Sequence, residues 1–184
     1  MADRLLPNVV RDVDGHEESR KGTVSVFNGP APTVARNSTT VEEIEGVARF
    51  IDQAIRDGIA PSEIGIFVRS RDQLDRARIT VKKADLNVFE LSGDGGDGAD
   101  RISIGTMHMA KGLEFKAVVV MACDDEVLPL QSRIEAVADE VELDDVYETE
   151  RQLLYVACTR ARDWLMVSCV QPGSEFLADL DRDP

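Results

Sequence analysis

The sequence predicts an α/β fold in which helices cover both faces of a mostly parallel sheet. Short apolar segments alternate along the chain with segments of helical periodicity, which is the pattern of such a fold. The run Ile64–Val68 is almost wholly apolar, as expected for a strand buried on both faces of a parallel sheet. A chain of 184 residues with 43% hydrophobic content can form one domain with a proper core. We therefore expect one domain over residues 23–184, preceded by a flexible polar lead-in at residues 1–22.

The first part of the expected domain contains a strand, a linker and a helix. Residues 23–27 alternate like a strand, and residues 30–37 have the composition of a linker. Thr40 and Glu43 match the S/T-x-x-E capping box, so a helix is expected to begin there. Gly58 supplies a residue that tolerates the left-handed end of that helix. One face of the helix carries Ile44, Val47, Ile51 and Ile55.

The remaining elements follow in alternation. Ser70 is expected to cap a helix that runs to about Ala84. The sequence G-D-G-G-D-G at Gly93–Gly98 lacks the context of a dinucleotide fingerprint and predicts a flexible loop. Acidic residues dominate positions 124–145, where we expect a solvated loop. Further strands are expected at 87–91, 101–105, 117–122 and 164–169, and a further helix at 147–162.

The distribution of charge limits the possible partners. A net charge of −14 argues against a free-standing nucleic-acid binder, because such domains usually carry a basic surplus. Basic residues nevertheless outnumber acidic ones by six to two between Arg69 and Lys83, which fits either a local basic face or a solvated helix surface. Between Asp124 and Glu150 eleven acidic residues face one basic residue, but their irregular spacing favours solvated side chains over a metal site.

Cysteine usage and hydropathy point to an ordinary intracellular protein. Cys123, Cys158 and Cys169 lack metal-ligand spacing and lie beside apolar residues, so we expect reduced, packed thiols and no metal site. No apolar run approaches the roughly 20 residues that a membrane span requires. The first eleven residues also lack the features of a secretory signal. We expect a cytoplasmic location and no membrane partner.

Two segments carry most of the functional information. Thr106–Phe115 has the pattern T-x-H-x-A-K-G-L-E-F, and Glu150–Ala161 has the pattern E-R-x-L-x-Y-V-A-x-T-R-A. These segments resemble, in the same order, motifs V and VI of the UvrD/Rep family of superfamily 1 DNA helicases. Functional groups of an open α/β sheet gather at the carboxyl ends of the strands, so both motifs are expected at that edge.

The resemblance implies the second, C-terminal RecA-like domain of a helicase, with a P-loop NTPase-type sheet. The phosphate-loop pattern G-x-x-x-x-G-K-[ST] does not occur in the sequence. Helicases of this family hydrolyse ATP with Mg²⁺ between two RecA-like domains, and the first domain supplies the phosphate loop. We therefore expect the N-terminal Walker A-containing domain and single-stranded DNA as partners. The chain alone should not hydrolyse ATP.

Residue roles follow from the same resemblance. Glu114 would accept a hydrogen bond from the ATP ribose, and Arg160 would act as an arginine finger on the γ-phosphate. A planar, permanently charged guanidinium suits the second role, and the alternative is a helix-surface arginine in an ion pair. Gly112 would lie on the nucleotide side of a loop in which Lys111 couples the nucleotide to the DNA.

Other residues would contact the DNA strand. Thr106 and His108 match positions that face single-stranded DNA, and an imidazole can stack on a base or donate to a phosphate. The segment Ile66–Leu74 resembles a further family motif, in which Arg69 and Ser70 are weaker candidates for strand contact. Only about ten residues separate Leu91 from Arg101, where classical members insert a large helical subdomain.

Two other functions stay open at this point. The chain could act independently as a non-catalytic nucleic-acid or protein-binding module, although its negative charge counts against independent DNA binding. It could also belong to a helicase-nuclease, which would need a metal-binding carboxylate and lysine cluster beyond Pro184.

Overall fold

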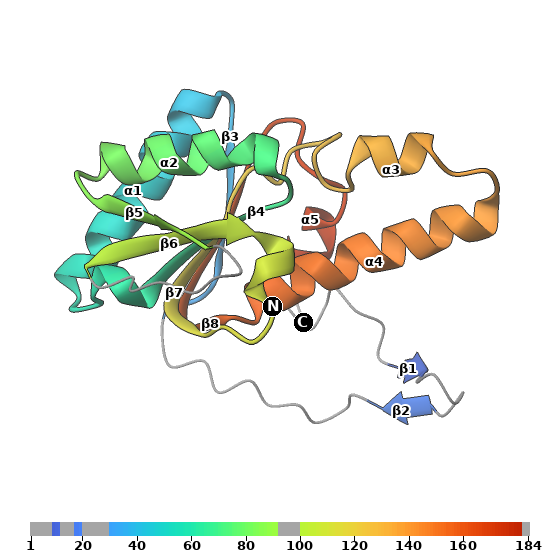
Figure 1. Cartoon of the computed structure of the whole chain (residues 1–184), viewed down its shortest axis with the longest axis horizontal. Coiled ribbons are helices and arrows are strands. Elements are labelled where there is room, and N and C mark those ends of the chain that lie inside the picture. The colour runs from blue at the N-terminus through green and yellow to red at the C-terminus, as the bar shows by residue number, and fades with distance from the viewer. Residues whose placement is uncertain (1–8, 12–16, 20–29, 92–99, 182–184) are drawn as a thin grey trace.

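A six-stranded parallel sheet forms the centre of the molecule, in the strand order β3–β8–β7–β4–β6–β5 (Figure 1). The computed structural model describes residues 9–11, 17–19, 30–91 and 100–181. The strands are β3 (Thr33–Asn37), β4 (Ile64–Val68), β5 (Asn87–Glu90), β6 (Arg101–Thr106), β7 (Phe115–Val120) and β8 (Ala161–Val170). All five strand pairs are parallel, so the expected α/β fold is confirmed.

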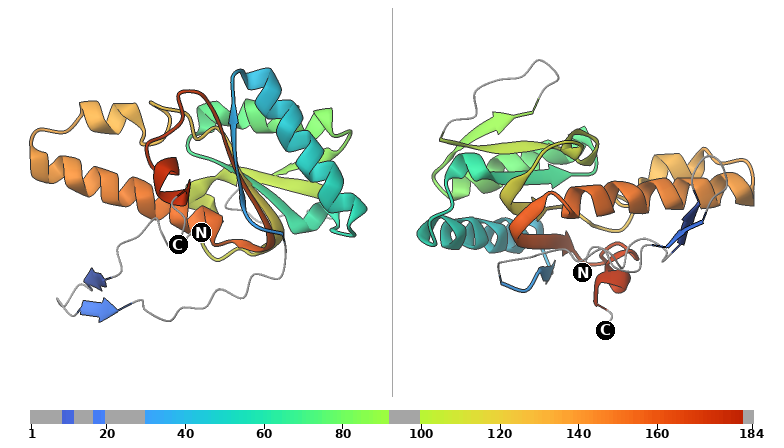
Figure 2. Two further views of the ribbon diagram at one scale, coloured as in Figure 1. Left: turned by 180° about the vertical axis from the view of Figure 1, so that it is seen from behind. Right: turned by 90° about the horizontal axis from the view of Figure 1, so that it is seen from below.

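Helices lie on both faces of this sheet (Figure 2). Ile64, Ile66 and Val68 of β4 belong to the core beneath α1 (Thr40–Arg56) and α2 (Leu74–Lys83). Phe67 belongs to the opposite core, which includes residues of α4 (Glu140–Cys158), the 3-10 helix η4 (Met107–Ala110) and α5 (Leu177–Asp181). All five residues of β4 are buried, which confirms the interpretation of its apolar run.

The cap of α1 lies one residue earlier than the sequence predicted. The Thr39 hydroxyl accepts a hydrogen bond from the Glu42 N–H at 3.2 Å, and the Glu42 carboxylate accepts one from the Ser38 N–H at 2.8 Å. The capping residues are therefore Thr39 and Glu42 rather than Thr40 and Glu43. Glu43 is fully buried instead, where it accepts hydrogen bonds from the Ser168 hydroxyl at 2.6 Å and the Ala122 N–H at 3.1 Å.

The segment expected as a linker at residues 30–37 contains a strand. Thr33–Asn37 pairs in parallel with β8 and forms the edge of the sheet. An edge strand needs no long apolar run, because its pairing comes from the backbone and its side chains stay partly exposed. The strand expected at residues 23–27 lies outside the described residues.

Ser70 does not cap α2 as predicted. It precedes a 3-10 helix, η3 (Arg71–Gln73), and its side chain makes no capping hydrogen bond. α2 then begins at Leu74 and ends at Lys83, close to the predicted end. Gly58, after α1, has a φ of 90°, as its expected role requires, and a further 3-10 helix, η2 (Pro61–Glu63), precedes β4.

The prediction of a solvated loop at residues 124–145 is wrong. This region contains α3 (Gln131–Glu135) and the first six residues of α4. The Asp139 carboxylate caps α4 by accepting from the N–H groups of Val141 and Glu142. Acidic residues favour the first turn of a helix, so the charge that suggested a loop also suits a helix start. α4 ends at Cys158, four residues before the predicted end.

Several expectations concern parts of the chain outside the described residues. These are the Gly93–Gly98 loop and most of the lead-in at 1–22, within which β1 (Val9–Arg11) pairs antiparallel with β2 (Glu17–Ser19). The boundary at residue 23 stays a prediction. The three cysteines are free and buried, as predicted. Among the described helices, none has both the length and the apolar character needed to cross a membrane.

Candidate functional site

The segment from Thr106 to Glu114 crosses one face of the sheet from edge to edge. β6 ends at Thr106, η4 follows at once, and β7 begins at Phe115. β6 and β7 are parallel and separated by β4, so the segment leaves the carboxyl edge of the sheet and returns at the amino edge. Met107 and Ala110 of η4 pack with Leu154 and Ala157 of α4 in one core. The two motifs therefore lie side by side on this face.

Thr106, His108 and Ser70 lie together at the carboxyl edge. Val68 of β4 pairs with Thr106 of β6, so the residues that follow each strand leave the sheet as neighbours. The His108 side chain is exposed, whereas Thr106 and Ser70 are half-buried. Two hydroxyls and an imidazole thus share one edge, as the sequence predicted for residues that face a DNA strand.

Arg69 does not belong to that exposed set, because its guanidinium is bound inside the protein. It is 4% exposed, and its Nε and Nη2 atoms donate to the fully buried Glu150 carboxylate, both at 2.5 Å. Glu150 also accepts from Arg133 of α3 at 2.9 Å and from the Leu130 N–H at 3.4 Å. This bidentate pair joins β4 to α4. The Nε–Nη2 edge of Arg69 is thus occupied by Glu150, which counts against a DNA contact, and the predicted role of Arg69 stays a prediction.

The charges of this cluster control the protonation of its members. Burial alone would raise the pKa of Glu150, but the hydrogen bonds and charges of Arg69 and Arg133 outweigh burial and hold its pKa below the ordinary value. The pKa of His108 is lowered, first by desolvation and then by the positive charges of Arg69 and Arg133, against the opposing charge of Glu150. Desolvation and the neighbouring arginines thus favour the neutral imidazole of His108.

Glu114 and Arg160 lie together at the opposite, amino edge of the sheet. Arg160 immediately precedes β8, and Glu114 immediately precedes β7. The Phe115 N–H donates to the Arg160 carbonyl at 3.0 Å, and Arg160 Nη1 donates to the Leu113 carbonyl at 3.3 Å. The expectation that both motifs lie at the carboxyl edge is thus wrong for these two residues. The crossover segment starts at the carboxyl edge and ends at the amino edge. The motif Thr106–Phe115 therefore contributes residues to both edges of the sheet.

The Arg160 guanidinium folds back onto its own helix end. Its Nε donates to the Val156 carbonyl at 3.0 Å, and its Nη2 donates to the Thr159 hydroxyl at 3.2 Å. No carboxylate among the described residues pairs with it. The side chain is half-buried beside the exposed Glu114. The Glu114 carboxylate can accept hydrogen bonds from the hydroxyls of a nucleotide. The Arg160 guanidinium, which has no acidic partner in the described part of the chain, can donate to its phosphates.

Lys111 and Gly112 form the turn that leads to this edge. Gly112 has a φ of 80°, a left-handed conformation that a residue with a Cβ adopts at a cost. Lys111 is exposed and has no hydrogen bond or ion pair with any other described residue. The turn therefore needs glycine at 112 for its backbone, and it leaves the ammonium of Lys111 available.

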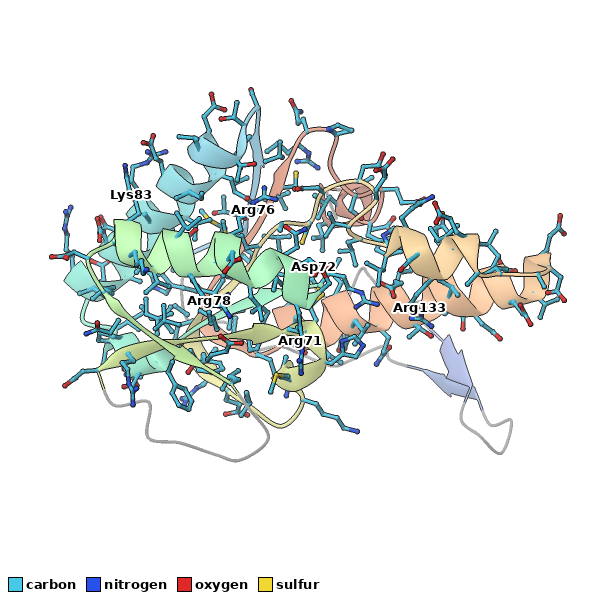
Figure 3. All side chains as sticks on the ribbon, turned by 45° about the horizontal axis from the view of Figure 1, so that its top comes forward. Arg71, Asp72, Arg76, Arg78, Lys83 and Arg133 are labelled. Carbon is cyan, nitrogen blue, oxygen red and sulfur yellow. The ribbon has the colours of Figure 1, made fainter. Side chains whose placement is uncertain are left out.

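The basic segment 69–83 does not form a continuous basic face, because most of its cations have acidic partners. Figure 3 labels four cations of this segment, Arg71, Arg76, Arg78 and Lys83. Arg78 pairs with Asp75 and Glu90, and Lys83 pairs with Glu45. Arg76 is 9% exposed and bound to Glu43 and Asp124. The side chain of the exposed Arg71, at the start of η3, forms no hydrogen bond or ion pair with another described residue. Of the two interpretations, a local basic face or a solvated helix surface, the helix surface is the better one, and most of its cations are ion-paired.

No group of three or more His, Cys, Asp and Glu side chains in the described ranges is arranged to hold a metal ion. Glu114 is the acidic residue beside Arg160, and one carboxylate provides too few ligands for a magnesium site of its own.

Comparison with known families decides where this arrangement belongs. The sequence model of the UvrD-like helicase C-terminal domain matches residues 81–172, which contain both motifs. The chain belongs to this family. Its parallel sheet, with the first motif on a crossover and the second on the adjoining helix, is therefore a UvrD-like helicase C-terminal domain.

Individual relatives match about half of the chain or less. ATP-dependent DNA helicase PcrA of Bacillus subtilis (strain 168) is 32% identical over 111 residues, which cover 54% of this chain and 14% of that protein. ATP-dependent DNA helicase Rep of Buchnera aphidicola is 34% identical over 85 residues, covering 46% and 12%. A putative ATP-dependent DNA helicase, YjcD of Bacillus subtilis (strain 168), is 43% identical over 70 residues, covering 37% and 9%. The matched part spans less than one sixth of each of these relatives.

A solved structure shares the fold. The crystal structure of the C-terminal domain of a possible DNA helicase from Lactobacillus plantarum WCFS1 superimposes with a TM-score of 0.62 at 22% identity. The superposition covers 84% of this chain and 83% of the other. At this identity the similarity concerns the fold alone.

Sequence reasoning missed two arginines of this UvrD-like domain. Arg133 lies between Glu150 and solvent with its side chain 37% exposed, and Arg71 lies beyond the carboxyl end of β4. Arg133 is the one basic residue in the acidic segment 124–150, which is the signal that could have singled it out. Arg71 follows Arg69 by only two residues. The sequence does not distinguish them, and only the fold shows that Arg69 is buried and Arg71 exposed.

Proposed function

We propose that this chain is the second motor domain of an ATP-dependent DNA helicase or translocase of the UvrD/Rep type. The observation that supports the proposal best is the path of the segment Thr106–Glu114. Its start lies beside exposed polar groups at one edge of the sheet, and its end lies against Arg160 at the other. One short segment thus connects a surface suited to a DNA strand with Glu114 and Arg160, which are suited to a nucleotide.

At the amino edge, Glu114 accepts a hydrogen bond from the ATP ribose and Arg160 donates to the γ-phosphate. When bound, ATP with Mg²⁺ supplies the phosphoryl group, and the N-terminal Walker A-containing domain holds most of it. Arg160 has to leave neutral carbonyl acceptors to reach a phosphate. Hydrogen bonds to an ionised acceptor are roughly twice as strong as neutral ones, so the exchange is favourable. Gly112 gives the loop the turn that brings Glu114 to this edge.

At the carboxyl edge, Thr106, Ser70 and His108 contact single-stranded DNA. A neutral imidazole can stack on a base or donate one hydrogen bond, and the hydroxyls can donate to phosphate oxygens. Arg71 and Arg133 add the positive charge that a phosphate backbone requires. A small positively charged surface of this kind can exist on a chain whose net charge is strongly negative.

The two edges act together in a cycle of domain closure. ATP draws the two motor domains together, and hydrolysis releases them, so that grip on the strand alternates. Lys111, in the turn between the two edges, couples the nucleotide side to the DNA side. Without the Walker A-containing domain there is no second surface to close on, so the isolated chain is inactive. We keep the cytoplasm as the proposed location.

DNA-stimulated ATP hydrolysis tests this proposal. The chain is assayed alone and mixed with a separately produced Walker A-containing domain from the same gene region. We expect no activity alone, activity on mixing, and a loss of at least about 10³-fold with Arg160→Ala, the lower end of what an arginine finger contributes. Arg160→Lys should not restore activity, because lysine lacks the planar fork.

Arg162→Ala is the matched control, because Arg162 is an exposed arginine two residues further along. It should keep the activity of the native mixture. If the two domains associate but hydrolysis is absent, or if hydrolysis is indifferent to Arg160, the stand-alone binding module becomes the better description.

A further inference from the structure

α3 and the first half of α4 project beyond the sheet (Figures 1 and 2). A groove lies between these two helices. Its volume is about 380 Å³. Ala136, Val137 and Val146 give it apolar walls, and Glu142 and Asp145 border it with carboxylates. None of the proposed nucleotide contacts lines the groove, and of the residues proposed for the DNA surface only Arg133 does.

The projecting pair of helices holds half of the net charge of the chain. Residues 135–148 contain seven acidic residues and no basic one, against a total net charge of −14. All seven are exposed, and none forms an ion pair with a described residue. Elsewhere in the described structure acidic side chains are often paired with arginine or lysine, so this concentration of carboxylates without cationic partners is local.

An exposed apolar side chain lies among these carboxylates. Val141 is 72% exposed. It shares a helix face with Asp144, Asp145 and Glu148, which follow it by three, four and seven residues in α4. The surface therefore offers apolar contact and negative charge together.

We propose that the α3–α4 groove binds an amphipathic helix of a partner protein, in which lysines or arginines flank an apolar anchor. The apolar walls and Val141 would accept the anchor, and the unpaired carboxylates would face the cations. Nucleic acid is a poor occupant, because its phosphates would meet seven carboxylates and a single lining cation, Arg133, which already donates to Glu150. This inference goes beyond the motor role and does not depend on it.

The groove shares one residue, Arg133, with the ion-pair cluster of Arg69, Glu150 and Arg133 at the carboxyl edge. Arg133 lines the groove and donates to Glu150, which in turn binds Arg69 beside His108. A partner in the groove therefore sits next to the surface proposed for the DNA strand, and its binding can be measured without ATP.

Fluorescence anisotropy with a labelled peptide tests the proposal on the full 184-residue chain. The probe is a helical peptide with lysines on one face and leucines on the other. Its partner probe has every leucine replaced by serine. The variant Asp144→Asn, Asp145→Asn, Glu148→Gln is compared with a control triple, Asp57→Asn, Asp72→Asn, Asp85→Asn, which removes the same charge from exposed sites elsewhere.

We expect the α3–α4 triple to weaken binding of the leucine peptide about tenfold and the control triple to weaken it less than about twofold. Each exposed ion pair between peptide and protein contributes modestly, and its effect is screened over short distances. Val141→Ser should weaken binding of the leucine peptide but not of the serine peptide. Hydrogen exchange should report protection of amides in residues 132–148 when the leucine peptide is bound.

Three results would overturn the proposal. The first is equal weakening by both triples, which would mean that only the total charge matters. The second is equal affinity for the leucine and serine peptides, which would leave no role for the groove. The third is protection of residues 132–148 by a single-stranded oligonucleotide rather than by the peptide, since the occupant would then be nucleic acid. Thermal unfolding of each variant verifies that the fold is intact.

Discussion

A single carboxylate, that of Glu150, organises the carboxyl edge of the site. It accepts from Arg69, from Arg133 and from the Leu130 N–H, and so joins β4, α3 and α4. A buried ion pair contributes little net stability relative to apolar residues, but removing one partner leaves the other charge buried without compensation. The main effect of removing Glu150 would therefore be to leave the buried charge of Arg69 without a partner.

Glu150→Ala should lower the free energy of unfolding by about 3–5 kcal/mol at pH 7, because the buried Arg69 loses its acceptor. The pKa of Glu150 is lowered in the folded state, so its stabilising contribution is complete above the ordinary value of 4.5 and is lost as the pH falls through the folded pKa. The difference between native chain and variant should therefore shrink below pH 4.5. Urea unfolding at several pH values measures both effects.

Glu148→Ala provides the control for this measurement. Glu148 is exposed on the same helix and should change stability by no more than about 0.5 kcal/mol. A cost below about 1 kcal/mol for Glu150→Ala would contradict the role assigned to the buried pair.

At the scale of elements, the position of Phe115 depends on a glycine in the neighbouring strand. A Cβ on Gly65 of β4 would lie 2.9 Å from the Phe115 ring. That ring is also held edge-to-face against Phe67, with centroids 5.9 Å apart. Since Phe115 follows Glu114 directly, the packing of β4 against β7 fixes where the crossover ends, on the side that we propose for the nucleotide.

Gly65→Ala should destabilise the fold by about 1–3 kcal/mol, because the aromatic ring cannot move without disturbing its core. Gly105→Ala is the matched comparison in β6. A Cβ there would meet the end of the Leu91 side chain at 3.0 Å, which can rotate away, so the cost should be smaller. Thermal unfolding of both variants checks this order. Equal costs would show that the aromatic ring is free to adjust.

At the scale of the whole molecule, the arrangement of charge decides how the chain can meet DNA. Most arginines and lysines of α2 are neutralised by carboxylates, and the projecting helices add unpaired negative charge. The surface that we propose for a phosphate backbone is the small area around His108, Arg71 and Arg133. Such a surface is too limited to bind a strand firmly without help from a second domain.

The isolated chain should therefore bind single-stranded oligo(dT) with a Kd weaker than roughly 10⁻⁴ M at physiological salt, the weak end of non-specific binding. Adding the Walker A-containing domain should strengthen binding more than about tenfold, because two linked surfaces then hold one strand. Fluorescence anisotropy at two salt concentrations measures both values. Tight binding by the isolated chain would favour the independent binding module instead.

Sequence alone predicted the parts of this molecule that have a local signal. The buried strand Ile64–Val68, the apolar face of α1 and the family of the chain all follow from short patterns, and all are confirmed. The edge strand β3 was missed because its pairing resides in the backbone. The start of α4 was missed because acidic residues fit both a loop and a helix start.

The site was predicted less completely, because its geometry depends on contacts between distant residues. The partner of Arg69 lies 81 positions further along the chain, so no local pattern identifies Arg69 as buried. Likewise, only the strand order reveals that Thr106 and Glu114 lie at opposite edges. The proposed roles of Thr106, His108, Glu114 and Arg160 stay predictions.

The crossover from Thr106 to Phe115 has almost no spare length. Because Phe67 pairs with both Gly105 and Val120, Phe115 lies six residues below the level of Thr106. This corresponds to about 20 Å along the strands and about 10 Å across two strand spacings, or about 22 Å in a straight line. Four 3-10 residues and five extended ones reach only about 25 Å. A displacement of Thr106 by more than about 3 Å therefore has to pull Glu114 with it or open the turn at Gly112.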